Sequence, residues 1–150
     1  MANNYTNFSL AFQLNGGNKA RTWIQKVLHK ASTLAGDDTD DKDIQEVFPN
    51  WNFSQCMGFE WSFEADPNNK KAPVSLWIRD PGGEGDAESV ANFIQAYLKK
   101  FDPKGKVGFQ FAHTCSSQRV DEFGGGACVV TAKKQKWINT FDWVNKEMSK

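Results

Sequence analysis

Apolar side chains alternate with small or polar ones through four separate segments of this chain, and this pattern limits its fold more than any other feature. The segments are residues 7–14, 57–64, 74–79 and 106–115. A period of two residues is typical of β-strands that bury one face and leave the other toward solvent. In the first segment, Phe8, Leu10, Phe12 and Leu14 fall on one side. The sequence therefore predicts a sheet with one apolar face.

Two further segments have the periodicity of amphipathic helices. Residues 18–33 place an apolar stripe on one side of a helix, made of Trp23, Ile24, Val27, Leu28 and Ala31. A second helix is predicted after Asp86, whose carboxylate is well placed to cap its first turn. Its inward stripe is Val90, Phe93, Ile94, Tyr97 and Phe101. Pro103 and Gly105 end it.

The order of these elements predicts the fold class. After the strand at 106–115 we expect a strand at 127–132 and a short helix at 140–148, with Thr140 as its cap. The order is then β-α-β-β-α-β, followed by β-α. This is an α+β, ferredoxin-like two-layer sandwich, extended by a hairpin strand and a C-terminal helix. A chain of 150 residues fits a single domain, residues 1–150.

The aromatic face of the sheet is predicted to be core. Phe59, Trp61, Phe109 and Phe111 continue the face begun by the first strand. The segment 107–113 has the look of an RNA-binding aromatic strand, but its phenylalanines belong to this apolar face. Eighteen basic and eighteen acidic residues balance, so nothing favours a nucleic-acid partner. We expect neither nucleic acid nor membrane as a partner.

The opposite face of the sheet is small and polar around one tryptophan. It is predicted to carry Ser9, Ala11, Gln13, Glu60, Ser62, Ser75, Trp77, Arg79, Gly108, Gln110, Ala112 and Thr114. Such a face can accept a partner, and Trp77 and Glu60 are its candidate contact residues. A homodimer through this open face is one alternative. The other is that the terminal helix covers it with Phe141, Trp143 and Val144.

Three consecutive glycines, Gly124, Gly125 and Gly126, lie in a connection of about a dozen residues that is longer than a hairpin needs. They fit turn and bulge geometry, or they leave room for a ligand or partner. Because an apolar, β-branched run follows them, a nucleotide-binding phosphate loop is excluded.

Arg119 and Phe123 lie in the same connection. Arg119 is close to Asp121 and Glu122, which predicts an ion pair that fixes the loop. The alternative is that Arg119, Asp121 and Phe123 are displayed together for recognition, because arginine and aromatic side chains dominate binding energy at interfaces.

The segment 114–132, "TCSSQRVDEFGGGACVVTA", with the opening "NYTNFS" and the closing "NTFDWVNKE", resembles a family of small uncharacterised proteins from bacteria and their phages. The matching positions are Cys115, Arg119, Asp121, Gly124, Gly125, Gly126, Ala127 and Trp143. At the position before the arginine, where family members often carry proline, this chain has Gln118. The resemblance implies a phage or mobile-element neighbourhood and no established activity.

Groups that perform chemistry are few. Cys56, Cys115 and Cys128 show no metal-binding spacing, and their odd number argues against a disulfide framework. His113 and Cys115 share a strand face, but side chains two residues apart on a strand stand too far apart for a nucleophile and its base. The acidic segment 36–43 reads as a solvated loop. We expect no metal, no cofactor and no catalytic set.

We therefore predict a small cytoplasmic protein-binding module, acting as an inhibitor or an immunity-type protein encoded by a phage or mobile element. The alternative is a small-ligand enzyme with its site at the 115–127 hairpin loop, using Arg119 and Asp121. The first class is favoured by the lack of paired catalytic groups.

Overall fold

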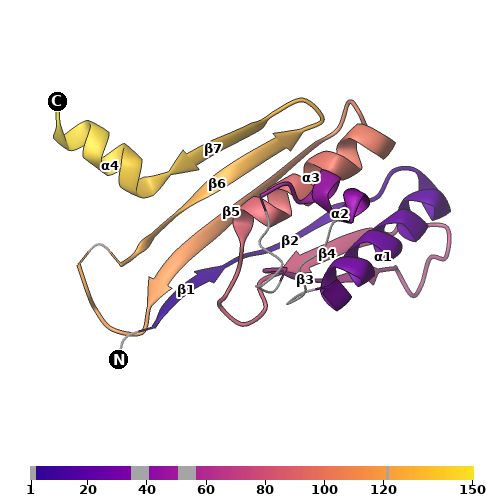
Figure 1. Ribbon diagram of the computed structural model, residues 1–150, viewed down its shortest axis with the longest axis horizontal. Helices are drawn as coiled ribbons and strands as arrows, with labels where there is room; N and C mark the ends of the chain where they lie inside the picture. The colour runs from indigo at the N-terminus through magenta and orange to yellow at the C-terminus, as the bar shows by residue number, and fades with distance from the viewer. Residues whose placement is uncertain (1–2, 35–40, 51–56, 121) are drawn as a thin grey trace.

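The computed structural model describes residues 3–34, 41–50, 57–120 and 122–150. Four helices and seven strands lie in these residues (Figure 1). In chain order they are β1 (Asn4–Asn7), β2 (Ser9–Gln13), α1 (Gly17–Leu34), α2 (Lys42–Val47), β3 (Glu60–Glu64), β4 (Ser75–Arg79), α3 (Ala87–Phe101), β5 (Lys106–Cys115), β6 (Gly124–Thr131), β7 (Gln135–Asn139) and α4 (Thr140–Met148).

The strands form two antiparallel sheets, so the predicted α+β class is confirmed. One sheet has the order β1-β5-β6-β7 and the other β2-β4-β3. The predicted hairpin of β3 and β4 is present, with Trp61 opposite Ile78 and Phe63 opposite Leu76. The single sheet expected from the sequence is not found. In its place, the segment read as one strand at 7–14 begins only at Ser9, and β1 precedes it in the other sheet.

The division between the sheets falls at Phe8, whose backbone is bonded to Asp80. The Phe8 amide donates to Asp80 Oδ1 at 2.8 Å. The Phe8 carbonyl accepts from the Asp80 amide at 3.0 Å. Before this residue the chain pairs with β5, and after it with β4. The break therefore depends on a residue 72 positions away, which alternation in the local sequence does not reveal.

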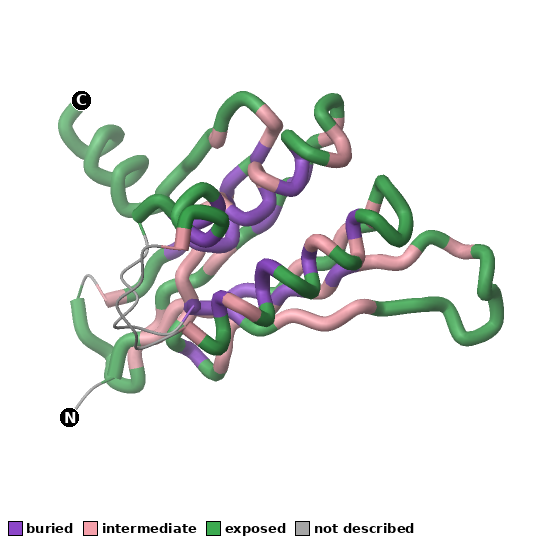
Figure 2. The backbone as a smooth tube through the Cα atoms, turned by 45° about the vertical axis from the view of Figure 1, so that its right-hand side comes forward, coloured by how far each residue is buried: buried purple, intermediate pink, exposed green. Residues whose placement is uncertain are grey.

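Helices α1, α2 and α3 pack together over one side of the strands, and the core lies between these layers (Figure 2). Phe59 and Phe109 are buried, as predicted, while Trp61 and Phe111 are half-buried against the core. The central α3 begins at the predicted cap, because Asp86 accepts from the amides of Glu88 and Ser89. One helix was missed: Asp41, at the end of the acidic segment, caps α2.

The C-terminal part of the chain extends away from this core. Strand β7, which the sequence analysis did not predict, is the outer strand of its sheet, and α4 projects beyond the sheet end (Figure 1). Every residue of α4 is exposed (Figure 2). Helix α4 thus does not cover the open sheet face, where Ser9, Ala11, Gln110 and Ala112 stay exposed. None of the helices in the described part of the chain is both long and apolar enough to cross a bilayer.

Candidate functional site

The three glycines lie inside β6, and the expectation that they form part of the loop is wrong. Strand β5 ends at Cys115 and β6 begins at Gly124, so the connection is residues 116–123. A Cβ atom at Gly125 would overlap the carbonyl oxygen of Phe111 on β5, and one at Gly126 would overlap that of Ile138 on β7. Any side chain at these two positions would meet the backbone of a neighbouring strand, so glycine is required at both.

A hydroxyl group joins β6 to the start of α4. The Gly125 amide donates to Thr140 Oγ1 at 3.0 Å, and that hydroxyl donates to the Gly125 carbonyl at 3.1 Å. Thr140 was predicted to cap α4, but Asn139 does so, accepting from the amides of Phe141 and Asp142. Thr140 instead uses its side chain to form the last hydrogen-bonded pair between β6 and the C-terminal segment.

The loop 116–123 presents its predicted contact residues to solvent. Arg119 and Phe123 are exposed, and the Arg119 amide donates to the Ser117 carbonyl. Among the described residues Arg119 forms no ion pair, with Glu122 or any other acid. Asp121, the other predicted partner, lies outside the described residues. The pairing expected for Arg119 thus has no support from Glu122.

A cavity of about 550 Å³ lies beside this loop. Three of its lining residues, Phe123, Gly124 and Gly125, are among the partner-contact candidates predicted from the sequence. Phe141 from α4 and Tyr5 from β1 lie on its other sides. The loop, the glycine strand and the start of the C-terminal helix therefore meet at one place, although Arg119 does not line this cavity.

A second cavity of about 500 Å³ adjoins the first and shares His113 with it. His113 Nδ1 is 3.1 Å from Thr6 Oγ1, and the ring packs edge-on against Phe111. Phe111 in turn packs against Trp137 of β7, with ring centroids 5.9 Å apart. Sequence analysis placed Phe111 in the core and did not assign a role to Trp137, because β7 was not predicted.

Trp77 and Glu60, the other predicted contact residues, are brought together through Arg79. The Arg79 guanidinium lies 4.1 Å from the Trp77 ring centroid, and its Nε is 3.5 Å from Glu60 Oε2. The indole donates to Ser9 Oγ at 2.8 Å. This group is on the β2-β4-β3 sheet, away from the loop. Arg79 also donates from Nη1 to Ser62 Oγ at 3.2 Å, so these side chains are linked into one surface cluster.

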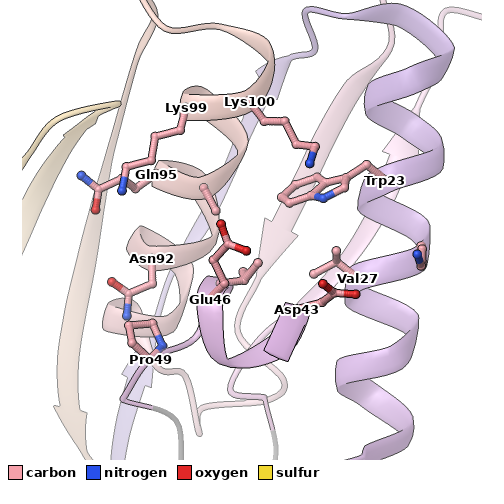
Figure 3. Close-up of a pocket in the computed structure, with 12 residues that line it drawn as sticks. Trp23, Val27, Asp43, Glu46, Pro49, Asn92, Gln95, Lys99 and Lys100 are labelled. Atoms are coloured by element: carbon pink, nitrogen blue, oxygen red, sulfur yellow. The ribbon is translucent and has the colours of Figure 1, made fainter. Parts of the chain in front are cut away.

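Helices α1, α2 and α3 enclose a further cavity of about 480 Å³ (Figure 3). Trp23 forms one side, with the Lys100 ammonium 5.8 Å from its ring centroid. Asp43 and Glu46 of α2 and Lys99 of α3 also line this cavity (Figure 3). The sequence analysis missed this cavity because it read residues 36–43 as a loop and predicted no helix at Lys42–Val47.

The large apolar side chains that are exposed in the described residues come from one stretch of the sequence. In the described residues, all nine exposed large hydrophobic side chains lie between Val120 and Met148. They are Val120, Phe123, Val129, Trp137, Ile138, Phe141, Trp143, Val144 and Met148. We call β7 and α4 together, residues Gln135–Met148, the C-terminal arm. Six of the nine belong to this arm.

Two titratable groups, Cys128 and Asp80, have pKa values shifted by their surroundings in the fold. Burial raises the pKa of the Cys128 thiol to about 11. Partial burial alone would raise the pKa of Asp80, but hydrogen bonds from the amides of Phe8 and Gly83 and from Asn7 outweigh it and lower that pKa. No three His, Cys, Asp or Glu side chains of the described residues gather closely enough to hold a metal ion. Cys56 lies outside these residues.

Comparison of the chain with protein-family models, with curated proteins and with solved structures finds no match.

Proposed function

We propose that this chain is a small cytoplasmic protein-binding module whose binding surface is formed by the C-terminal arm and the loop 116–123. One observation carries the proposal: eight of the nine exposed large hydrophobic side chains of the described residues lie in this loop or in the arm. Solitary exposed apolar residues are ordinary on protein surfaces, whereas their concentration in one region is typical of an interaction site. Two tryptophans, Trp137 and Trp143, are among them, and tryptophan is enriched at interface hot spots.

Two finer parts of the proposal concern fold and origin. Only Phe8 separates β1 from β2, so counting them as one strand gives the order β5, β1 with β2, β4, β3, which supports a ferredoxin-like arrangement extended by β6 and β7. The resemblance of residues 114–132 to small bacterial and phage proteins supports an origin in a phage or mobile element. For a binding module of that origin, the role that we propose is that of an inhibitor or an immunity-type protein.

Affinity capture from a bacterial host tests the proposal. We expect the wild-type chain to retain a specific protein that is lost from the arm variant Phe141→Ser with Trp143→Ser. Loss from Arg119→Ala with Phe123→Ala would place the loop in the same interface. The control is Trp77→Ser on the β2-β4-β3 sheet, which should retain the partner. Circular dichroism must show each variant folded. Equal capture by wild type and both surface variants contradicts the proposal.

The second candidate is a small-ligand enzyme with its site at the 115–127 segment. The cavity of about 550 Å³ favours it, because that volume suits a small molecule and His113 lies at its boundary. A thermal-shift screen of metabolites distinguishes the two. Stabilisation by one metabolite that is lost in His113→Ala supports the enzyme. Retention of a protein partner by that variant supports the binding module.

A further inference from the structure

We propose that the C-terminal arm binds a second copy of this chain, forming a symmetric dimer in which the two β7 strands pair antiparallel. This inference deepens the proposed function, on which it rests, by naming the partner of the arm. It is carried by the free edge of β7, the exposed apolar area of α4 and β7, and the charges that an antiparallel register would bring together.

Strand β7 has an unpaired outer edge. In the β6-β7 hairpin the Thr131 amide donates to the Lys134 carbonyl at 2.9 Å. Because bonded and non-bonded pairs alternate along antiparallel strands, the backbones of Lys136 and Ile138 then point toward β6. The backbone groups of Gln135 and Trp137, and the Asn139 amide, point outward. No strand of the described residues pairs with that side.

The other edge of the same sheet is covered. Thr6 on β1 forms a parallel bridge with Glu84. Its amide donates to the Gly83 carbonyl at 2.6 Å, and its carbonyl accepts from the Gly85 amide at 3.1 Å. An uncovered edge is a template for pairing with another chain. In this sheet, β7 is the edge that offers such a template.

In the described part of the chain, helix α4 adjoins β6 and β7, but none of its apolar residues is buried. It contains nine residues, shorter than the length at which isolated helices become stable in water. Phe141, Val144 and Met148 follow helical spacing along one side, and none is buried. Trp143, 65% exposed, lies on the other side. Because α4 has apolar residues on both sides, its own sheet could bury only one side, and a second surface is needed to bury the other.

The exposed area is close to what a dimer needs. Met148 is 81% exposed and Ile138 is 69% exposed. With Trp137, Phe141, Trp143 and Val144, they present on the order of 600 Å² per chain, given the usual sizes of such side chains. A stable interface buries roughly 800 Å² on each partner. The arm with its polar rim approaches this size, and its apolar part lies at the upper end of the range for the largest apolar patch on a monomer, roughly 300–600 Å².

The register follows from the sequence of β7. Centring the symmetry axis on Trp137 pairs all five residues of the strand and places Lys136 opposite Ile138 of the second copy. A shift of two residues toward the hairpin turn would instead place Lys136 opposite itself, and like charges directly opposite destabilise a strand pair. The register centred on Trp137 is therefore favoured.

The same register brings opposite charges together. If the register is extended beyond β7, Thr140 lies opposite residue 134 of the second copy. The first turn of α4, which contains Asp142, then approaches the turn of the second copy that contains Lys133 and Lys134. Symmetry repeats this contact, giving two acid–base pairs per dimer. The chain has a formal net charge of zero, so overall repulsion between copies is small.

Sedimentation equilibrium of the full chain, from about 1 to 100 μM, tests the dimer. Wild type should sediment with twice the mass of 16.9 kDa. Ile138→Lys removes apolar area and opposes Lys136, so it should weaken the dimer about tenfold or more. Val120→Lys, at an exposed position outside the arm, is the matched control and should leave the dimer unchanged. A wild-type monomer at 100 μM overturns the inference, and so does a dimer that Ile138→Lys does not weaken.

A charge exchange tests the register. Asp142→Lys should weaken the dimer, and adding Lys133→Glu with Lys134→Glu should restore it. Circular dichroism must show each variant folded. Failure of the exchanged variant to recover affinity overturns this register.

The dimer and the proposed function fail separately. A monomeric chain that still captures another protein through the arm excludes the dimer and leaves the binding module intact. If the chain is a monomer and its arm variants capture the same proteins as the wild type, both the dimer and the proposed binding surface are excluded.

Discussion

The hydroxyl of Thr140 bonds both the amide and the carbonyl of Gly125, and so takes the place of a backbone partner where β7 gives way to α4. Gly125 is buried, and its lack of a side chain lets β6 approach β5 at the same point. Beyond the backbone pairing of β7 with β6, the start of α4 is therefore tied to the sheet by one side chain and one glycine.

Thr140→Val should weaken that attachment. Valine has nearly the shape of threonine but cannot bond the Gly125 amide and carbonyl, and leaving buried polar groups unpaired costs about 1–3 kcal/mol. We expect faster hydrogen exchange at the Gly125 amide, measured by NMR. Thr140→Ser keeps the hydroxyl and should retain most of the protection. Equal protection in the valine variant would show that the arm is held by other contacts.

Phe109→Ala tests the predicted core. The side chain is 6% exposed and packs against the rings of Phe8, Phe111 and Trp137. Removing a large core aromatic typically costs about 3–5 kcal/mol of unfolding free energy. Urea denaturation followed by circular dichroism measures the loss. Phe123→Ala, at an exposed loop position, is the control and should change stability by less than about 0.5 kcal/mol. Similar effects of the two substitutions would contradict the core assignment.

Elements with strong amphipathic patterns were predictable from sequence. The helix expected at 18–33 is found as α1 at Gly17–Leu34, and the strand expected at 106–115 is β5 with the same bounds. In both, one face is apolar because it packs on the core, so local sequence and tertiary structure agree.

Features fixed by distant contacts could not be predicted. The break at Phe8 depends on Asp80, and the glycines lie in a strand because Phe111 and Ile138 approach them. Strand β7 has its two apolar residues, Trp137 and Ile138, side by side and buries none of its residues, so it shows no alternation that would predict a strand. The candidate site was found in part: Phe123 and two glycines line the cavity, but the arm beside it depends on β7.

Of the two cysteines in the described residues, Cys128 should react with an alkylating reagent more slowly than Cys115. Burial raises its pKa to about 11, so at pH 8 only about one molecule in a thousand carries the thiolate. Iodoacetamide labelling followed by peptide mass spectrometry should modify the half-exposed Cys115 first. In urea, where both thiols are exposed, the two rates should converge. Equal labelling of both thiols in the folded protein would contradict the burial of Cys128.

Asp80→Asn should destabilise the protein at neutral pH and much less at low pH. The folded state holds the pKa of Asp80 below its ordinary value of 3.8, because its carboxylate accepts hydrogen bonds from Phe8, Gly83 and Asn7 despite partial burial. A lowered folded pKa means that the stabilisation is fully present above the unfolded pKa and disappears as the pH falls through 3.8 toward the folded value. Asparagine keeps one acceptor oxygen and turns a donor toward the remaining amides. We expect a loss of about 1–3 kcal/mol at pH 7.

The measurement is urea denaturation of wild type and variant at pH 7, 5, 3 and 2, because taking the difference between the two proteins cancels the titration of the other acids. That difference should be largest at pH 7 and 5 and should shrink below pH 4. Glu46→Gln, at an exposed position of α2, is the control and should stay within about 0.5 kcal/mol of wild type. A difference between Asp80→Asn and wild type that is the same at every pH would show that the shape of the side chain, and not its charge, joins β1 and β2 to the turn after β4.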